Sequence, residues 1–228
     1  MKIAILGAMP EEISPLLEKL QNYEKINYAN NSYYLAQYKK HELILAYSKI
    51  GKVNSTLSAS IMIEKFKAET LLFTGVAGAF NPNLKIGDLL VANKLCQYDL
   101  DITAFGHPLG FVPGNEVFVK TDEKLNALAK EVANELGVKL HEGIIATGDE
   151  FICDEVKKSK IREVFNADAC EMEGASVALV CEALKVPCFI LRAMSDEAGE
   201  KAEFDFDEFV VKSAQTSAEF VLKICDKL

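Results

Sequence analysis

The chain has 228 residues, of which 34 are acidic and 25 are basic, and its formal net charge at pH 7 is −9. This balance argues against a general affinity for nucleic acid, because such binding needs a basic stripe that displaces counterions from phosphates. Half of the residues are hydrophobic, which is enough for one sizeable core, so we expect a single domain over residues 1–228.

Short β-type runs alternate with segments of helical periodicity along the whole chain. The expected strands are 2–6, the hairpin 32–47, 70–74, 87–96, 143–147 and 188–193, and the expected helices are 11–20, 53–66, 122–136, 173–185 and 206–226. Strands that are apolar throughout are typical of a sheet with helices on both faces, whereas "SYYLAQYKKHELILAY" resembles an antiparallel hairpin at a sheet edge. The pattern predicts a three-layer α/β/α fold around a mixed, twisted sheet.

The N-terminal run "KIAIL" is too short for a signal peptide or a membrane span, and no other stretch approaches 18 uncharged residues. We therefore expect a soluble cytoplasmic protein with no membrane partner. The six cysteines form no CxxC pair and show no metal-ligand spacing, which indicates reduced structural thiols. We expect neither a bound metal nor another cofactor.

Polar and glycine-containing segments follow the expected strands. They are "GAMPEE", "KIGK", "GVAGAF", "GDEFI" and "MSDEAGE". In open α/β sheets the ligand crevice lies beyond the carboxyl ends of the strands, so these segments should meet at one edge of the sheet. The sequence predicts a small-molecule site there, with "GVAGAF" as a turn that lets a ligand approach the backbone.

Several common site types lack their sequence signatures. "GVAGAF" has no following GK[ST], and "IGKV" lacks the first glycine of a phosphate-binding loop. The three histidines stand in no HExxH arrangement, and no GxSxG nucleophile elbow is present. A nucleotide-phosphate loop, a zinc hydrolase and a serine hydrolase are therefore not supported.

Carboxylates are the chemical groups that remain at the strand ends. They are Glu11, Glu12, Glu171, Glu173 and Asp196. Each has an ordinary alternative role as a helix N-terminal acid or a cap. Enzymes that cleave glycosidic bonds, however, need one acid to protonate the leaving group and another to activate water or stabilise the cation. Several carboxylates on one crevice favour that chemistry.

The segments "MKIAILGAMPEE", "SKIGKVN", "FTGVAGAF", "TGDEFI", "EMEGASVA", "RAMSDEA" and "FDEF" follow one another in the order seen in a known family. In this order they resemble the bacterial methylthioadenosine/S-adenosylhomocysteine nucleosidases of the purine nucleoside phosphorylase superfamily. The resemblance covers essentially the whole chain. It implies a nucleoside phosphorylase-like fold, a homodimer, and irreversible hydrolysis of the bond between adenine and ribose.

The resemblance also implies a role for three acids. Glu12 activates the attacking water, Glu173 holds the ribose 2′ and 3′ hydroxyls, and Asp196 donates a proton to adenine N7. These roles fit the chemistry, because positive charge builds on the ribose and negative charge on the purine as the bond lengthens. Asp196 would then have to hold its proton near neutral pH.

Other substrate contacts are implied in the same way. Within one chain they are Met9, Ile50, Val76, Ala77, Gly78, Phe151, Ile152, Glu171, Met172, Arg192, Ser195 and Phe206, and Ile102, Phe105 and Pro113 come from the neighbouring subunit. The segment 102–113, "ITAFGHPLGFVP", is too apolar and aromatic for a free surface loop, which supports a homodimer. An apolar 5′ pocket suits an alkylthio group.

Two other functions compete with hydrolysis. A phosphorylase needs cations near the sugar, but "PEE" would repel phosphate, and the chain's two arginines are Arg192 and Arg162. A nucleoside-binding module without turnover is disfavoured because Glu12 and Asp196 are both present.

The chain departs from the family pattern at Val76, where many members have a serine. A hydroxyl that could contact the attacking water is therefore missing, which leaves Glu12 and Arg192 to position it. The sequence does not decide among 5′-methylthioadenosine, S-adenosylhomocysteine, 5′-deoxyadenosine and aminodeoxyfutalosine as substrates.

Overall fold

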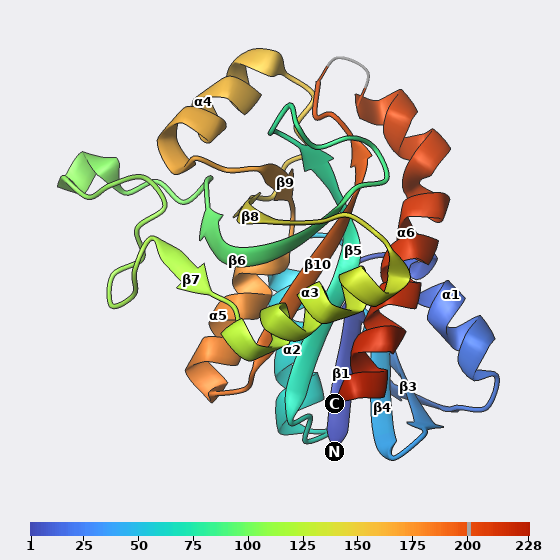
Figure 1. Cartoon of the computed structure of the whole chain (residues 1–228). Helices are drawn as coiled ribbons and strands as arrows, with labels where there is room; N and C mark the ends of the chain where they lie inside the picture. Colours follow the sequence, from blue (N-terminus) through green and yellow to red (C-terminus); the bar gives the residue numbers. More distant parts are fainter. Residues whose placement is uncertain (200–201) are drawn as a thin grey trace.

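A mixed β-sheet with helices on both faces organises the chain (Figure 1). The computed structural model describes residues 1–199 and 202–228, without the side chains of 203–205, 207 and 208. The strands are β1 (Lys2–Gly7), β2 (Glu24–Tyr28), β3 (Asn31–Tyr38), β4 (His41–Tyr47), β5 (Thr70–Ala79), β6 (Leu89–Gln97), β7 (Phe118–Lys120), β8 (Leu140–Thr147), β9 (Ala169–Glu171) and β10 (Cys188–Asp196). The helices are α1 (Pro10–Leu20), α2 (Lys52–Glu64), α3 (Glu123–Leu136), α4 (Glu155–Phe165), α5 (Gly174–Leu184) and α6 (Ala202–Lys227), with a 3₁₀ turn at Thr103–Phe105.

The sheet order is β10-β6-β8-β9-β5-β1-β4-β3-β2, with β7 on β6. β1 runs parallel to both β4 and β5, and β3 pairs antiparallel with β4, which confirms the predicted hairpin. β10 pairs with β5 and also with β6, so β5, β10, β6, β8 and β9 form a closed circuit of strands. The carboxyl ends of β1, β4, β5 and β10 therefore meet at one end of the sheet.

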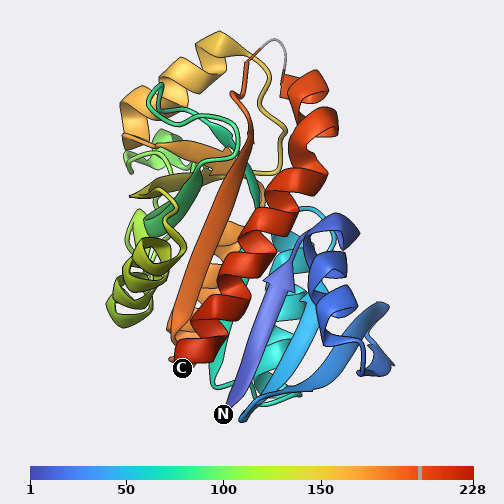
Figure 2. The same ribbon diagram turned by 45° about the vertical axis from the view of Figure 1, so that its right-hand side comes forward.

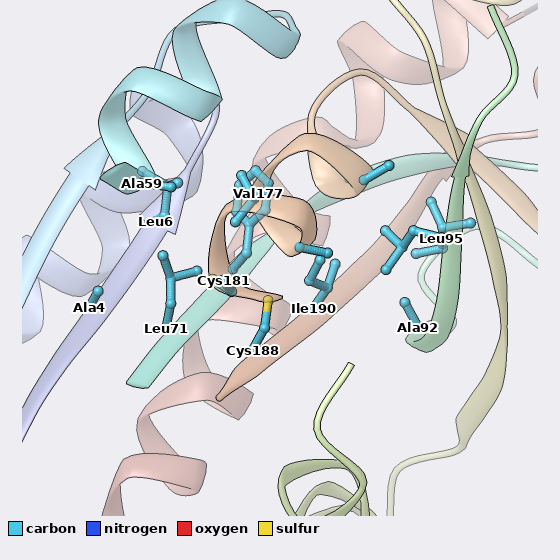
Figure 3. Close-up of a cluster of buried hydrophobic side chains, with 14 of the residues drawn as sticks. Ala4, Leu6, Ala59, Leu71, Ala92, Leu95, Val177, Cys181, Cys188 and Ile190 are labelled. Carbon is cyan, nitrogen blue, oxygen red and sulfur yellow. The ribbon is translucent and has the colours of Figure 1, made fainter. Parts of the chain in front are cut away.

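Alternation along β1 shows how the layers form. Ala4 and Leu6 face α2 and α5, and Ile3 and Ile5 face α1, α3 and α6, with all four side chains fully buried. Figure 3 shows the first of these clusters, where Val177 and Cys181 of α5 lie over the sheet. The predicted three-layer arrangement is confirmed.

Helix α6 runs along the other face of the sheet, between β10 and α1 (Figure 2). Its 26 residues make it the longest of the helices in the described part of the chain. Among the described residues, no helix combines the length and the apolar character needed to cross a membrane.

The structure corrects three sequence-based expectations about element boundaries. "GVAGA" is not a turn, because β5 continues in register with β10 through this segment to Ala79. Likewise β10 extends to Asp196, with a bulge between Met194 and Asp196. β2 lies outside the predicted hairpin and forms the sheet edge. The extension of β5 has a physical cause, since its backbone pairing with β10 outweighs the local tendency of a Gly-containing segment to turn.

Candidate active site

A cavity lies at the carboxyl ends of the strands. It is lined by Ala8, Met9, Glu12, Ile50, Val76, Ala77, Gly78, Glu150, Phe151, Ile152, Cys170, Glu171, Met172, Glu173, Ser195, Asp196 and Phe206. Most of these residues are apolar or glycine, and five of them are acids. This composition suits a small organic molecule with a few polar groups.

Glu12 lies at the start of α1, where Pro10 occupies the first helical turn. Its Oε2 accepts hydrogen bonds from the N–H groups of Ala8 (2.5 Å) and Met9 (2.9 Å), and its Oε1 accepts one from Val76 (3.0 Å). A carboxylate oxygen has two lone-pair directions, so Oε1 keeps one for a molecule in the cavity.

Burial shifts the proton affinity of Glu12. The side chain is only 3% exposed, and the resulting desolvation raises the pKa of its carboxyl above 4.5. The charge of Arg192 and three backbone hydrogen bonds lower this pKa, but by less than desolvation raises it. A carboxyl with a raised pKa is a stronger base than an ordinary one, which suits proton abstraction near neutral pH.

Two glycines of β5 leave space for acids that come from α1 and β10. A Cβ atom at Gly75 would lie 2.5 Å from Glu12 Oε1, and one at Gly78 would lie 2.7 Å from Asp196 Oδ1. The glycines of "GVAG" thus serve close approach of two carboxylates to a strand, in place of the predicted turn.

Glu171 and Arg192 form a buried ion pair of 2.7 Å. Glu171 also accepts hydrogen bonds from the Thr147 hydroxyl (2.5 Å) and from the N–H groups of Gly174 (2.7 Å) and Glu173 (3.1 Å). Arg192 donates to the Leu191 carbonyl at 3.1 Å and lies over the Phe73 ring. These partners leave the two oxygens of Glu171 with little remaining capacity to accept a hydrogen bond from a ligand.

Glu173 is the N-cap residue of α5 and is 5% exposed. Its Oε1 accepts a hydrogen bond from the Gly51 N–H at 2.8 Å. Desolvation and the neighbouring charge of Glu171 raise the pKa of Glu173 to about 8. The neutral, protonated form of Glu173 is therefore favoured near neutral pH.

Glu173→Gln should change how stability depends on pH. An unfolded carboxyl titrates near 4.5 and the folded one near 8, so between these values the folded protein binds the extra proton. The free energy of unfolding of the wild type then falls as pH rises from about 4.5 to 8, on the order of a few kcal/mol. Gln lacks this titration and still accepts from Gly51. We expect the variant to match the wild type near pH 5 and exceed it above pH 8.

Thermal unfolding at several pH values measures this difference. Glu182→Gln, a change at an exposed position of the same helix, is the matched control and should give a flat difference. A Tm difference between Glu173→Gln and the wild type that stays constant from pH 5 to pH 9 would contradict the assignment.

Asp196 ends β10, lines the same cavity and is 2% exposed. Its Oδ2 accepts from the Ser195 hydroxyl at 2.8 Å, and its Oδ1 accepts from the Ala198 N–H at 2.7 Å. In the wall of the same cavity, the rings of Phe151 and Phe206 meet edge to face at 5.7 Å. A carboxyl in a cavity with aromatic rings can hydrogen-bond the edge of a flat heterocycle while the rings contact its face.

Comparison with known proteins identifies the family. Residues 2–226 match the Phosphorylase superfamily. The chain belongs to this superfamily. It is 81% identical to the aminodeoxyfutalosine nucleosidase of Campylobacter jejuni over 100% of both chains, and 40% identical to a 5′-methylthioadenosine/S-adenosylhomocysteine nucleosidase of Bacillus thuringiensis over 100% of both.

Two solved structures have the same fold as this chain. The 5′-methylthioadenosine/S-adenosyl homocysteine nucleosidase of Campylobacter jejuni aligns over 100% of both chains with a TM-score of 0.97 and 81% identity. The native futalosine hydrolase of Helicobacter pylori aligns over 100% of this chain and 98% of its own with a TM-score of 0.99 and 52% identity.

The structure of this superfamily member brings most of the predicted site residues together. Every substrate contact predicted within one chain lines the cavity except Arg192, which lies behind Glu171 and does not reach the wall. Ile102, Phe105 and Pro113 are also absent from the wall, and Phe105 is 82% exposed.

Three lining residues were missed by sequence reasoning. Ala8 adjoins the predicted Met9, and Glu150 stands inside "GDEFI", so the strand-end pattern could have included both. Cys170 belongs to β9, a strand of three residues that gives no periodic signal. Its position became apparent only from the pairing of β9 with β5 and β8.

Proposed function

We propose that the protein hydrolyses the N-ribosidic bond of 5′-substituted adenine nucleosides, releasing adenine and the ribose product. The observation that carries this proposal is the presence of both Glu12 and Asp196 in the wall of one cavity, each buried and held by backbone N–H donors. Two acids in different surroundings are the requirement for cleaving a glycosidic bond.

The reaction follows from these positions. Glu12 Oε1 takes a proton from a water that attacks C1′, while Asp196 gives a proton to N7 of the leaving adenine. Glu173 binds the ribose hydroxyls, and the Glu12 carboxylate stabilises the positive charge that develops on the ribose in the transition state. Met172 and Ile50 line the cavity and provide apolar contacts for the sugar and the 5′ substituent.

Phosphorolysis is the weaker alternative. Among the described residues that line the cavity there is no Lys, Arg or His to hold a phosphate, and Arg192 is occupied by Glu171. Release of adenine from 5′-methylthioadenosine in phosphate-free buffer tests the proposal directly. A strict requirement for phosphate would indicate a phosphorylase, and binding without adenine release would indicate a binding module.

We propose aminodeoxyfutalosine as one substrate, because a relative that is 81% identical is named an aminodeoxyfutalosine nucleosidase. We also propose 5′-methylthioadenosine, S-adenosylhomocysteine and 5′-deoxyadenosine as substrates, and the cytoplasm as the compartment. All six cysteines are free thiols, which fits a reducing compartment. Comparison of kcat/KM across the four nucleosides ranks them.

We further propose a homodimer in which loop 102–113 completes the partner's 5′ pocket. Phe105 is 82% exposed, and the loop extends away from the sheet in Figure 1. Val53 on α2, three residues after the cavity residue Ile50, is 79% exposed. Exposed apolar side chains next to a site are typical of an interface.

Light scattering should therefore give twice the chain mass, and Phe105→Ser should raise KM roughly 10-fold through lost apolar burial. Val138→Ser, at an exposed apolar position after α3, is the matched control and should leave KM unchanged. A monomer with full activity at nanomolar concentration would refute the shared site.

A further inference from the structure

Three charged residues outside the cavity form a closed ring of hydrogen bonds through their side chains and two backbone N–H groups. Lys52 Nζ donates to Asp99 Oδ1 at 2.6 Å, the Asp149 N–H donates to Asp99 Oδ2 at 2.9 Å, and the Lys52 N–H donates to Asp149 Oδ1 at 2.8 Å. The ring joins the end of β6, the start of α2 and the loop between β8 and α4. We call it the Asp99–Lys52–Asp149 ring.

The ring adjoins the backbone that holds Glu173. Gly51 is the N-cap residue of α2, its φ is +98°, and no side chain of its own caps the helix. The carboxylate of Asp149 takes the N–H of the next residue, Lys52, and so supplies the cap from another segment. The N–H of Gly51 is thereby left to point at Glu173 Oε1, 2.8 Å away.

The same contacts explain why this position is a glycine. Its φ value lies in the region that favours glycine. A Cβ atom there would also lie 3.0 Å from Asp149 Oδ1. The Gly51 peptide is consequently fixed between the ring on one side and Glu173 on the other.

We propose that the Asp99–Lys52–Asp149 ring positions Glu173 for the ribose hydroxyls by holding the Gly51 N–H on its carboxyl group. This inference rests on the proposed function, which assigns those hydroxyls to Glu173. The ring residues are positioning residues, because none of them lines the cavity. Their neighbours Ile50 and Phe151 do line it, so the ring also fixes the spacing of two cavity walls.

Global stabilisation is a weaker explanation of the ring. The side chain of Asp149 is 47% exposed and that of Asp99 is 28% exposed. Ion pairs at such exposure contribute little to the free energy of unfolding. The ring instead acts locally, because it fixes the Gly51 peptide, whose N–H binds the carboxyl group of Glu173.

Asp149→Ala tests the inference on two substrates. It removes the acceptor for the Lys52 N–H, whereas Asp149→Asn keeps an oxygen there. On 5′-methylthioadenosine we expect Asp149→Ala to lose roughly 3- to 10-fold in kcat/KM, as for one weakened hydrogen bond between neutral groups, and Asp149→Asn to recover most of it. On the 2′,3′-dideoxy analogue the loss should be under about 2-fold, because Glu173 has no hydroxyl to hold.

For each substrate, the kcat/KM of the variant is divided by that of the wild type. The difference in intrinsic reactivity between the two nucleosides therefore cancels. Lys52→Met breaks the ring at another bond and should show the same selective loss, which covers the case that Asp149→Ala folds poorly. Lys19→Met, which breaks the exposed 2.7 Å pair with Glu219, is the matched control and should leave both substrates unaffected.

Two outcomes separate the inference from the proposed function. If the wild type releases no adenine from 5′-methylthioadenosine, the proposed function fails. If the wild type is active and Asp149→Ala loses equally on both substrates, or loses nothing on 5′-methylthioadenosine, the positioning role of the ring is wrong. Selective loss with recovery in Asp149→Asn supports it.

Discussion

Asp196→Asn is expected to lower turnover of 5′-methylthioadenosine by about 100-fold or more while the nucleoside still binds. Adenine is a poor leaving group until N7 gains a proton, and an amide cannot transfer one. The Asn oxygen can keep the 2.7 Å contact with the Ala198 N–H, so the segment after β10 should stay in place. The measurement is single-turnover kinetics together with the Kd of the nucleoside.

The leaving group supplies the control for this prediction. An analogue whose base departs without N7 protonation should be hydrolysed nearly as fast by Asp196→Asn as by the wild type. Ser195→Ala removes the 2.8 Å donor to Asp196 Oδ2 and retains the acid, so it should lose much less. Equal losses of Asp196→Asn on both substrates would count against the role of Asp196 as the acid.

Glu12→Gln is expected to reduce hydrolysis by roughly 10² to 10⁴-fold with little change in Kd, because a general base is removed at nearly constant volume. The amide oxygen can accept from Ala8 and Met9, which leaves the amide N–H₂ facing the Val76 N–H across the former 3.0 Å contact. One donor is then unsatisfied, and we expect a lower Tm of Glu12→Gln by a few degrees.

Glu11→Gln is the matched control, since Glu11 is the exposed neighbour of Glu12 on the first turn of α1. It should keep full activity. If Glu12→Gln kept activity within a few fold, water activation would have to be assigned to another group.

The strand-end rule explains why so many of the cavity residues could be predicted. Met9 and Glu12 follow β1, Ile50 follows β4, and Ser195 and Asp196 end β10, and parallel strands bring such positions to one edge. The alternative role of Glu12 as a helix N-terminal acid is also present, because its carboxylate accepts the N–H of the N-cap residue Met9. Capping and the proposed chemistry use the same carboxylate.

Long-range contacts account for what the sequence did not reveal. We expected Arg192 to place its positive charge near the attacking water. Its guanidinium instead contacts Glu171 and the Phe73 ring, because β10 packs against β5 and near β9 in the folded sheet. The glycines Gly75 and Gly78 suggest a turn when only their own segment is considered. In the fold they leave space for carboxylates of α1 and β10. Neither partner lies near them in sequence.

The place of β10 in the sheet has a consequence for biosynthesis. This strand, residues 188–196, pairs with both β5 and β6, which precede it by about a hundred residues. While a ribosome is still making the chain, the backbone groups of β5 and β6 that β10 will pair remain open and can bind other strands. Such non-local pairing is slow to form. A nascent chain therefore displays aggregation-prone edges until β10 emerges. The same strand carries Asp196, so the sheet edges close and the proposed site is completed in one late step.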